Sequence, residues 1–196
     1  MQVAIIDYNA GNIFSVDYAI KRLGANALIT SDKETIAKAD KVIFPGQGEA
    51  SSTMRYLRQS GMDKLILDLK QPTLGICIGM QLMCNRSEEG DTGCLGIFDT
   101  QVKKFVSQRH EDKIPHMGWN TLQNTKGALF NGSLDNKFVY FIHSYYVELN
   151  DYTTAISEHI QPFSVAMQKN NYYATQFHPE KSGKIGEQIL SNFLAL

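Results

Sequence analysis

The cysteine at position 77 lies in a sequence that could make it a nucleophile. Residues 75–79 read Gly-Ile-Cys-Ile-Gly, where an apolar run at 73–76 gives way to a helical pattern. A nucleophile flanked by glycines between strand and helix is typical of a nucleophile elbow, because larger side chains would collide across its strained turn. The helix dipole favours a thiolate there, and the Ile78 N–H would face an oxyanion. The alternative is a buried core thiol; we predict packing or surface thiols for Cys84 and Cys94.

A thiolate needs a base, and the base needs a group that orients it. Of the five histidines, His178 has the most informative neighbours, since residues 175–180 read Thr-Gln-Phe-His-Pro-Glu. An extended run ends at His178, Pro179 forces a turn, and Glu180 can fold back onto the imidazole. Taken alone, His178 and Glu180 could equally be a loop histidine beside a solvated carboxylate.

A glycine-rich turn is the third candidate. Residues 45–48 read Pro-Gly-Gln-Gly and follow a predicted strand at 42–44, so they should reach the same sheet edge as Cys77. Gly46 and Gly48 would let backbone N–H groups approach a ligand, and beside a nucleophile this turn at Gln47 could supply a second oxyanion donor. By itself the motif is weak, and a plain turn is the alternative.

These segments need a scaffold that brings strand ends together. The first hundred residues alternate short apolar runs with helix-spaced segments. We expect strands at 3–6, 27–29, 42–44 and 73–76, and helices at 13–23, at 50–69 with a break at Ser60-Gly61, and at 78–85. Such alternation with short connections predicts βαβ units and a largely parallel, buried sheet.

The second half of the chain has a different pattern. Short aromatic or β-branched runs predict antiparallel strands at 97–106, 137–142, 145–149, 152–157, 164–168 and 172–177, and a last helix covers 183–194. No linker is long enough to divide the chain. We therefore predict a single α/β domain over residues 1–196, with a mostly parallel central sheet flanked by helices and an antiparallel portion in the second half.

Composition argues against several other classes of protein. The 196 residues include 19 Lys and Arg against 20 Asp and Glu, and this net charge of −1 does not fit a nucleic-acid binder or a polybasic membrane-surface protein. No apolar stretch approaches the ~18 residues of a membrane-spanning helix, and the N-terminus lacks the basic region of a signal peptide. Three closely spaced cysteines fit reduced thiols and match no common zinc pattern, so we expect a cytoplasmic protein without a metal or cofactor.

Together the motifs resemble those of class I (triad) glutamine amidotransferases. Residues 75–81 read Gly-Ile-Cys-Ile-Gly-Met-Gln, residues 177–180 read Phe-His-Pro-Glu, and residues 45–48 are similar to the family's oxyanion loop. Residues 6–12 (Ile-Asp-Tyr-Asn-Ala-Gly-Asn), 115–120 (Pro-His-Met-Gly-Trp-Asn) and 176–182 (Gln-Phe-His-Pro-Glu-Lys-Ser) further resemble the subfamily of glutaminase subunits of imidazole glycerol phosphate synthase, of histidine biosynthesis. The resemblance covers essentially the whole chain and implies the class I amidotransferase fold.

The resemblance also implies a reaction. Cys77 would attack the side-chain amide of L-glutamine, His178 would transfer the protons, and Glu180 would orient His178. The N–H groups of Gln47 and Ile78 would hold the oxyanion. By motif position, the residues implied to bind glutamine are Gln81, Glu89, Ser144 and Tyr145. The carboxylate at position 89 could equally belong to a solvated loop.

A partner is implied as well. In this subfamily the glutaminase forms a heterodimer with a (β/α)8-barrel cyclase, where ammonia joins a ribonucleotide intermediate to give imidazole glycerol phosphate and aminoimidazole carboxamide ribonucleotide. A channel is chemically sensible, because ammonia in neutral water would become ammonium and cease to be a nucleophile. By motif match, the residues implied near the interface are Asn12, Met117, Trp119 and Lys181. Ordinary core packing or a generic exposed patch is the alternative for Met117 and Trp119.

Three positions depart from the usual pattern of the family: Gln47 stands where an apolar residue is usual, Asn9 replaces a frequent glycine, and Ser144 replaces a frequent threonine.

Three other functions stay open from the sequence. One is the glutaminase subunit of another triad amidotransferase, such as that of anthranilate synthase or of pyridoxal phosphate synthesis, although the run at 115–119 argues against it. The others are a stand-alone cysteine peptidase or γ-glutamyl hydrolase, and a flavodoxin-like binding module in which Cys77 is a buried thiol.

Overall fold

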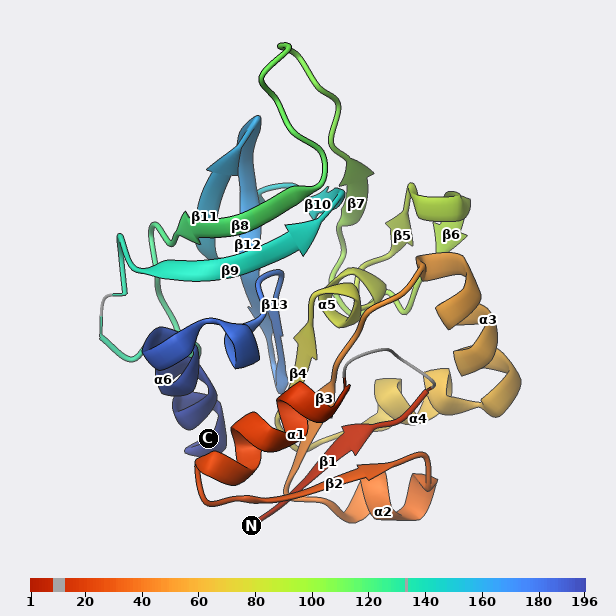
Figure 1. The fold of residues 1–196 in the computed structure, drawn as a ribbon. Helices are drawn as coiled ribbons and strands as arrows, with labels where there is room; N and C mark the ends of the chain where they lie inside the picture. Colours follow the sequence, from red (N-terminus) through yellow and green to blue (C-terminus); the bar gives the residue numbers. More distant parts are fainter. Residues whose placement is uncertain (9–12, 133) are drawn as a thin grey trace.

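The computed structural model describes residues 1–8, 13–132 and 134–196 (Figure 1). Within these ranges the centre of the molecule is an 11-stranded mixed sheet. Five neighbouring strands run parallel in the order β2-β1-β3-β4-β13. They are β1 (Gln2–Ile6), β2 (Asn26–Thr30), β3 (Lys41–Phe44), β4 (Thr73–Ile76) and β13 (Tyr172–Thr175). The carboxyl ends of β3, β4 and β13 therefore lie side by side.

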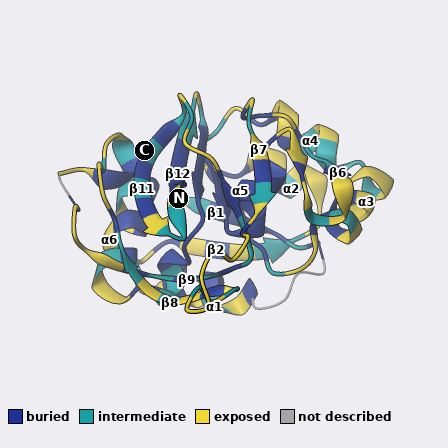
Figure 2. Cartoon of the chain, turned by 90° about the horizontal axis from the view of Figure 1, so that it is seen from above, coloured by how far each residue is buried: buried dark blue, intermediate teal, exposed yellow. Residues whose placement is uncertain are grey.

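Side chains of these strands alternate between two hydrophobic layers. In β1, Val3 and Ile5 pack into one layer and Ala4 and Ile6 into the other, as the period of a strand requires. Helices α1 (Ile13–Arg22) and α6 (Gly183–Leu194) cover the first layer, and the second is covered by α2 (Lys33–Lys38), α3 (Ala50–Ser60), α4 (Met62–Asp68) and α5 (Ile78–Leu82). Figure 2 shows buried strands between helices with exposed outer sides. No helix in the described ranges is long and apolar enough to cross a membrane.

Beyond β13 the sheet continues mainly in antiparallel pairs. Strand β12 (Gln161–Lys169) pairs with β13, β10 and β11, and β10 pairs in turn with β7. The other strands of this part are β5 (Arg86–Ser87), β6 (Thr92–Gly93), β7 (Gln101–Lys104), β10 (Tyr145–Val147) and β11 (Thr153–His159). A separate two-stranded antiparallel sheet consists of β8 (His116–Thr121) and β9 (Phe138–His143). Short 3-10 helices are formed by Glu89–Asp91, Ala128–Phe130 and Pro179–Lys181.

Two of the expected antiparallel strands differ in the structure. The run at 172–177 forms β13, which is antiparallel to β12 but parallel to β4, because it lies at the junction of the two parts of the sheet. The run at 97–106 forms only the shorter β7, since Ile97 and Phe98 pack into the core outside the strand. The expected helix break at residues 60–61 is confirmed, because Gly61 takes a φ of 67° between α3 and α4.

Candidate active site

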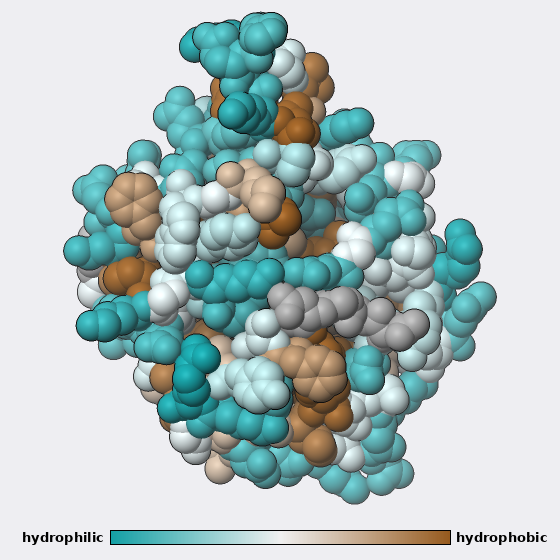
Figure 3. Space-filling view, viewed as in Figure 1, coloured by the Kyte–Doolittle hydropathy of each residue, from teal (hydrophilic) through white to brown (hydrophobic). Residues whose placement is uncertain are grey.

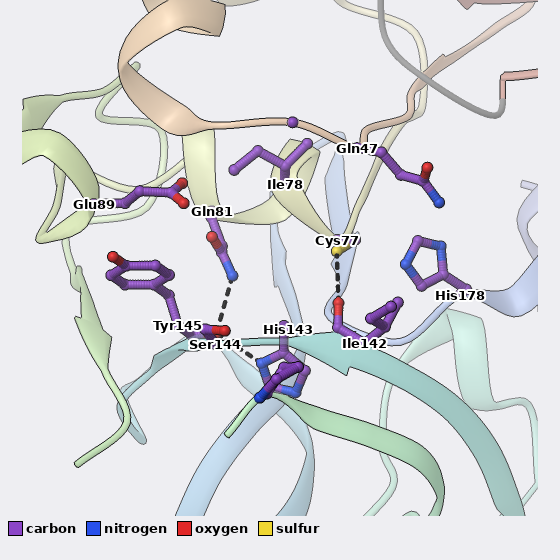
Figure 4. Close-up of a pocket in the computed structure, with 12 residues that line it drawn as sticks. Gln47, Cys77, Ile78, Gln81, Glu89, Ile142, His143, Ser144, Tyr145 and His178 are labelled. Atoms are coloured by element: carbon purple, nitrogen blue, oxygen red, sulfur yellow. Dashed lines mark hydrogen bonds between the residues drawn. The ribbon is translucent and has the colours of Figure 1, made fainter. Parts of the chain in front are cut away.

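The three sequence motifs meet at one edge of the sheet. Strand β3 leads into residues 45–48, β4 into Cys77, and β13 into His178. Because these strands are adjacent and parallel, their carboxyl ends converge, and a cavity of about 410 Å³ opens there (Figure 4). The cavity is lined by most of the site residues predicted from the sequence, namely Gln47, Gly48, Cys77, Ile78, Gln81, Glu89, Ser144, Tyr145 and His178.

Cys77 connects β4 to α5 in a strained backbone conformation, with φ of 54° and ψ of −108°. Its N–H donates to the Thr175 carbonyl of β13 at 2.7 Å, which extends the pairing of the two strands up to the cysteine. A Cβ on Gly75 would lie 2.9 Å from the backbone carbon of Gly79, and a Cβ on Gly79 would lie 2.1 Å from the Phe44 carbonyl oxygen. Close backbone approach thus requires both glycines, and the predicted elbow geometry is confirmed.

His178 and Glu180 form a buried pair beside Cys77. Nδ1 of His178 donates to Oε1 of Glu180 at 2.8 Å, and the two side chains are 2% and 3% exposed. The other ring nitrogen, Nε2, is buried and hydrogen-bonds to no other described residue. Figure 4 shows the ring next to Cys77. The carboxylate therefore fixes the proton on Nδ1 and leaves Nε2 for chemistry at the cysteine.

The charge on His178 is set by its neighbours. Burial disfavours the protonated ring, but the charge of Cys77 and the interaction with Glu180 outweigh burial and raise the pKa of His178 to about 10. When Cys77 is a thiolate, the ring is thus an imidazolium at neutral pH. Such a ring holds a proton ready for a leaving group.

The glycine-rich turn packs against the first residue of α5. A Cβ on Gly46 would lie 1.8 Å from Cγ2 of Ile78, so the turn and Ile78 are in direct contact. Gly48 has a φ of 144°, which favours glycine. As the first residue of α5, Ile78 has an N–H that the helix itself does not use. Gln47 points its amide toward His178 (Figure 4), and the donor role of its backbone N–H stays a prediction.

The predicted glutamine-binding residues form the other side of the cavity. Nε2 of Gln81 donates to the Tyr145 carbonyl at 3.0 Å. Glu89 is half-buried and accepts the Ala50 N–H at the start of α3 at 2.8 Å. Burial raises the pKa of Glu89 while this hydrogen bond opposes the rise. A carboxylate held in this way does not fit a solvated loop, although its contact with substrate stays a prediction, as does that of Ser144.

Comparison with known proteins identifies the family. The model of the family "Glutamine amidotransferase class-I" matches residues 4–196. The chain belongs to the class I glutamine amidotransferases. A non-enzymatic flavodoxin-like module is therefore excluded, and the resemblance inferred from the motifs is confirmed.

Relatives of this amidotransferase cover its whole length. It is 62% identical over 196 residues to imidazole glycerol phosphate synthase subunit HisH of Bacteroides fragilis, with 100% of both chains covered. It is 44% identical to the HisH subunit of Idiomarina loihiensis, covering 100% of this chain and 98% of the relative. A solved glutamine amidotransferase shares the fold with a TM-score of 0.72 at 18% identity, covering 98% and 97% of the two chains. Another, from Thermotoga maritima, has a TM-score of 0.66 at 14% identity, covering 99% and 96%. The predicted fold class is confirmed.

Three of the four predicted interface residues of the amidotransferase, Met117, Trp119 and Lys181, lie near the active site but outside its cavity. Met117 and Trp119 are 64% and 55% exposed on β8, so core packing is excluded for both. They line a second cavity of about 990 Å³. Figure 3, viewed as in Figure 1 with the β8–β9 sheet in front, shows hydrophobic residues scattered among hydrophilic ones. Lys181 ends the 3-10 helix that follows His178. Asn12 and the unusual Asn9 lie outside the described residues.

Four residues of the site were not predicted to belong to it: Gln176, Ile142, His143 and Pro115, the last of which also lines the cavity. The Gln176 amide lies 3.7 Å from Sγ of Cys77, and the Ile142 carbonyl lies 3.9 Å from the same sulfur. His143 lines the cavity at the end of β9. Gln176 had a signal, since it directly precedes the Phe-His-Pro-Glu motif, and so did Pro115, which begins the motif at 115–120. Among the described residues, no cluster of three or more His, Cys, Asp or Glu side chains could hold a metal ion.

Proposed function

We propose that this chain is the glutaminase subunit of imidazole glycerol phosphate synthase, acting in histidine biosynthesis as one amidotransferase domain over residues 1–196. The observation that carries the proposal is the convergence of Cys77 with the buried His178–Glu180 pair at one cavity, in a chain 62% identical to a HisH subunit. The substrate is L-glutamine, and the products are glutamate and ammonia. A cytoplasmic location belongs to the proposal and is supported by three unpaired cysteines.

The first half-reaction forms a thioester. The Cys77 thiolate attacks the side-chain carbonyl carbon of glutamine, and the carbonyl electron pair moves to oxygen, where the N–H groups of Ile78 and Gln47 stabilise it. The imidazolium of His178 gives its Nε2 proton to the amide nitrogen. The C–N bond then breaks, neutral ammonia leaves, and a γ-glutamyl thioester remains.

The second half-reaction restores the cysteine. The neutral ring of His178, held by Glu180, takes a proton from water while the water oxygen attacks the thioester carbon. The C–S bond breaks, Cys77 returns to the thiolate, and the ring again carries two protons. Glutamate leaves as the carboxylic acid and loses its proton to solvent.

Gln81 and Glu89 would recognise the amino-acid end of glutamine. The Gln81 amide nitrogen donates to the Tyr145 carbonyl and to Oε1 of Gln176, so both of its hydrogens are used within the protein. Only the Gln81 carbonyl oxygen is left for a ligand, and an oxygen accepts from an ammonium group. The Glu89 carboxylate on the same cavity adds the opposite charge.

The ammonia passes to a (β/α)8-barrel cyclase with which the chain forms a heterodimer. The second cavity supports this, because Pro115 lines both cavities and Met117 and Trp119 line only the second. An exposed apolar rim next to the glutaminase site fits a partner that must receive ammonia before it is protonated.

Substitution of the nucleophile tests the proposal. In Cys77→Ala, glutamine hydrolysis measured as glutamate release should be abolished, both for the chain alone and with its cyclase. The same complex should still make imidazole glycerol phosphate when an ammonium salt replaces glutamine. In the wild-type chain, glutamate release should be slow alone and rise when the cyclase and its nucleotide are added.

Cys94→Ala is the matched control, since Cys94 is also an unpaired thiol but lies outside the cavity. It should keep wild-type glutaminase activity. Retained hydrolysis in Cys77→Ala would refute the nucleophile. Equal hydrolysis with and without the cyclase would instead favour a stand-alone γ-glutamyl hydrolase.

A further inference from the structure

Gln176 is a buried amide that contacts the reactive sulfur. It follows β13 directly, has no exposed surface, and its N–H donates to the Val165 carbonyl at 2.8 Å, which continues the pairing of β13 with β12. Its side chain lies between Gln81, at 2.9 Å, and Sγ of Cys77, at 3.7 Å. None of the catalytic steps above uses this side chain.

The hydrogen-bond network fixes which end of the Gln176 amide faces the sulfur. The Tyr145 carbonyl can only accept, so the Gln81 atom 3.0 Å away must be the amide nitrogen. The same nitrogen lies 2.9 Å from the Gln176 amide, and that neighbouring atom must therefore be the oxygen. The remaining atom, Nε2 of Gln176, is the one that faces Cys77. A flipped amide would place two donors against each other.

We propose that Gln176 stabilises the Cys77 thiolate by donating an N–H to Sγ, and that Gln81 holds it in the donating orientation. The inference rests on the proposed function, in which Cys77 is the nucleophile. The donor gains strength when the sulfur becomes an anion, because a hydrogen bond to a charged group is stronger than one to a neutral group. The Ile142 carbonyl, which also lies beside the sulfur, favours the protonated thiol instead, since a carbonyl can accept only from an S–H group.

The two contacts make Gln176 a link between substrate and nucleophile. The Gln81 nitrogen orients the Gln176 amide, which leaves the Gln81 carbonyl oxygen for glutamine in the cavity that Gln81 lines. Removing the Gln176 donor should therefore act mainly on kcat, because it affects the reacting sulfur. Removing Gln81 should act on both KM and kcat, since it affects the substrate and the Gln176 orientation.

The rate at which iodoacetamide alkylates Cys77, followed against pH, measures the stabilisation of its thiolate and does not require glutaminase activity. In Gln176→Met, which keeps the length of the side chain but cannot donate, the pH of half-maximal alkylation rate should move upward by about one pH unit or more. At pH values well below this midpoint, the rate should fall about tenfold, the scale of a lost hydrogen bond to a charged group. Modification is counted on the peptide that contains Cys77, so Cys84 and Cys94 do not contribute.

Gln176→Glu is the second variant, because it conserves volume and places a carboxylate beside the sulfur. It should move the alkylation profile further upward than Gln176→Met. Gln71→Met is the control, since the Gln71 amide bonds to the Ile36 carbonyl on the opposite layer. It should keep the wild-type profile.

A wild-type alkylation profile in either folded Gln176 variant, with folding checked by circular dichroism, would overturn the inference. That outcome, together with an inactive Cys77→Ala, would leave the proposed function intact. A shifted profile together with an active Cys77→Ala would keep the thiolate interaction and refute the nucleophile instead.

Discussion

Gly79 shows how a single residue type determines the geometry of the site. Its backbone crosses β3 so closely that a Cβ would lie 2.1 Å from the Phe44 carbonyl oxygen. The oxygen belongs to a buried strand and cannot move away as a flexible side chain could. The position of α5, and with it the direction of the Ile78 N–H, depends on the absence of that one carbon.

Gly79→Ala should therefore lower the free energy of unfolding by about 3 kcal/mol, the upper range for overpacking in a rigid core. The matched control is Gly93→Ala. A Cβ there meets only Nη2 of Arg58 at 3.5 Å, an ordinary contact, so the change should stay within about 0.5 kcal/mol. Urea unfolding of both variants checks the difference, and equal midpoints would contradict the steric argument.

The catalytic candidates could be found from the sequence because each has a local signal. Cys77 has flanking glycines, and His178 has a carboxylate two residues away, a spacing that the structure uses for a 2.8 Å hydrogen bond. Gln176 has only its place before the Phe-His-Pro-Glu motif as a signal, and Ile142 has none. Their contacts with the sulfur depend on where β9 and β13 end relative to β4, which no spacing along the chain specifies.

At the scale of elements, a pair of buried histidines joins β8 to β9. Nδ1 of His116 lies 3.0 Å from Nε2 of His143, and Nδ1 of His143 lies 2.7 Å from the Tyr145 carbonyl. Because that carbonyl accepts, His143 carries its proton on Nδ1 and its Nε2 is an acceptor. Nδ1 of His116 must therefore donate to Nε2 of His143. Nε2 of His116 then accepts from the Asn120 amide at 3.2 Å, and its ring stacks on His159. These hydrogen bonds require the rings of both His116 and His143 to be neutral.

These rings should make the protein less stable in mild acid. Burial, with a smaller effect of the His159 charge, lowers the pKa of His116 to about 4. Burial also lowers the pKa of His143 to about 3, although the hydrogen bond to Tyr145 opposes the shift. In the unfolded chain both titrate near 6.5, so the unfolded state binds more protons below that pH. The free energy of unfolding should fall as pH drops from about 6.5 toward 4.

His116→Asn tests this, because an asparagine amide can replace Nδ1 as donor to His143 but does not titrate. Between pH 7 and pH 5 the variant should lose less stability than the wild type by about 2 kcal/mol, the linkage value for this shift. Urea unfolding at the two pH values measures it. His110→Asn, at an exposed position, is the control and should keep the wild-type pH dependence. An unchanged pH dependence in His116→Asn would refute the role of this ring.

The elements that the sequence did not predict are those without a clear hydrophobic period. Helix α2 buries a single residue of its six, Ile36, and is started by Asp32, whose side chain caps the Thr35 N–H. Strand β8 exposes Met117 and Trp119, so its apolar side chains face away from the core. The two-residue strands β5 and β6 are too short for any pattern. The buried strands β1, β3 and β4, by contrast, were predicted because burial on both faces requires apolar side chains along the strand.

At the scale of the whole molecule, one face combines the active site with exposed apolar side chains. Phe14 and Tyr18 are each 62% exposed on α1, and Met117 and Trp119 are exposed on β8. Helix α1 and the β8–β9 sheet lie on the same side of the molecule (Figure 1). Trp119 pairs in register with Tyr140 of β9, whose carbonyl accepts the His178 N–H at 2.9 Å. A partner that covers Trp119 therefore contacts the strand pair that holds the backbone of His178.

The proposed cyclase interface predicts that Trp119→Ala weakens binding of that partner by about 2 kcal/mol, roughly a 30-fold rise in Kd, because large aromatic side chains contribute most to affinity in protein interfaces. The substitution should also reduce the rise in glutaminase activity at saturating cyclase, since the contact reaches His178 through Tyr140.

Leu67→Ala is the control, because Leu67 is 45% exposed but lies on α4, in the opposite layer. Titration calorimetry with the cyclase, followed by glutamate release at saturation, separates the two effects. If the Kd of Trp119→Ala equals that of Leu67→Ala, the cyclase binds elsewhere. If Kd rises but full activation returns at saturation, Trp119 contributes to affinity alone, and the link through Tyr140 does not transmit activation.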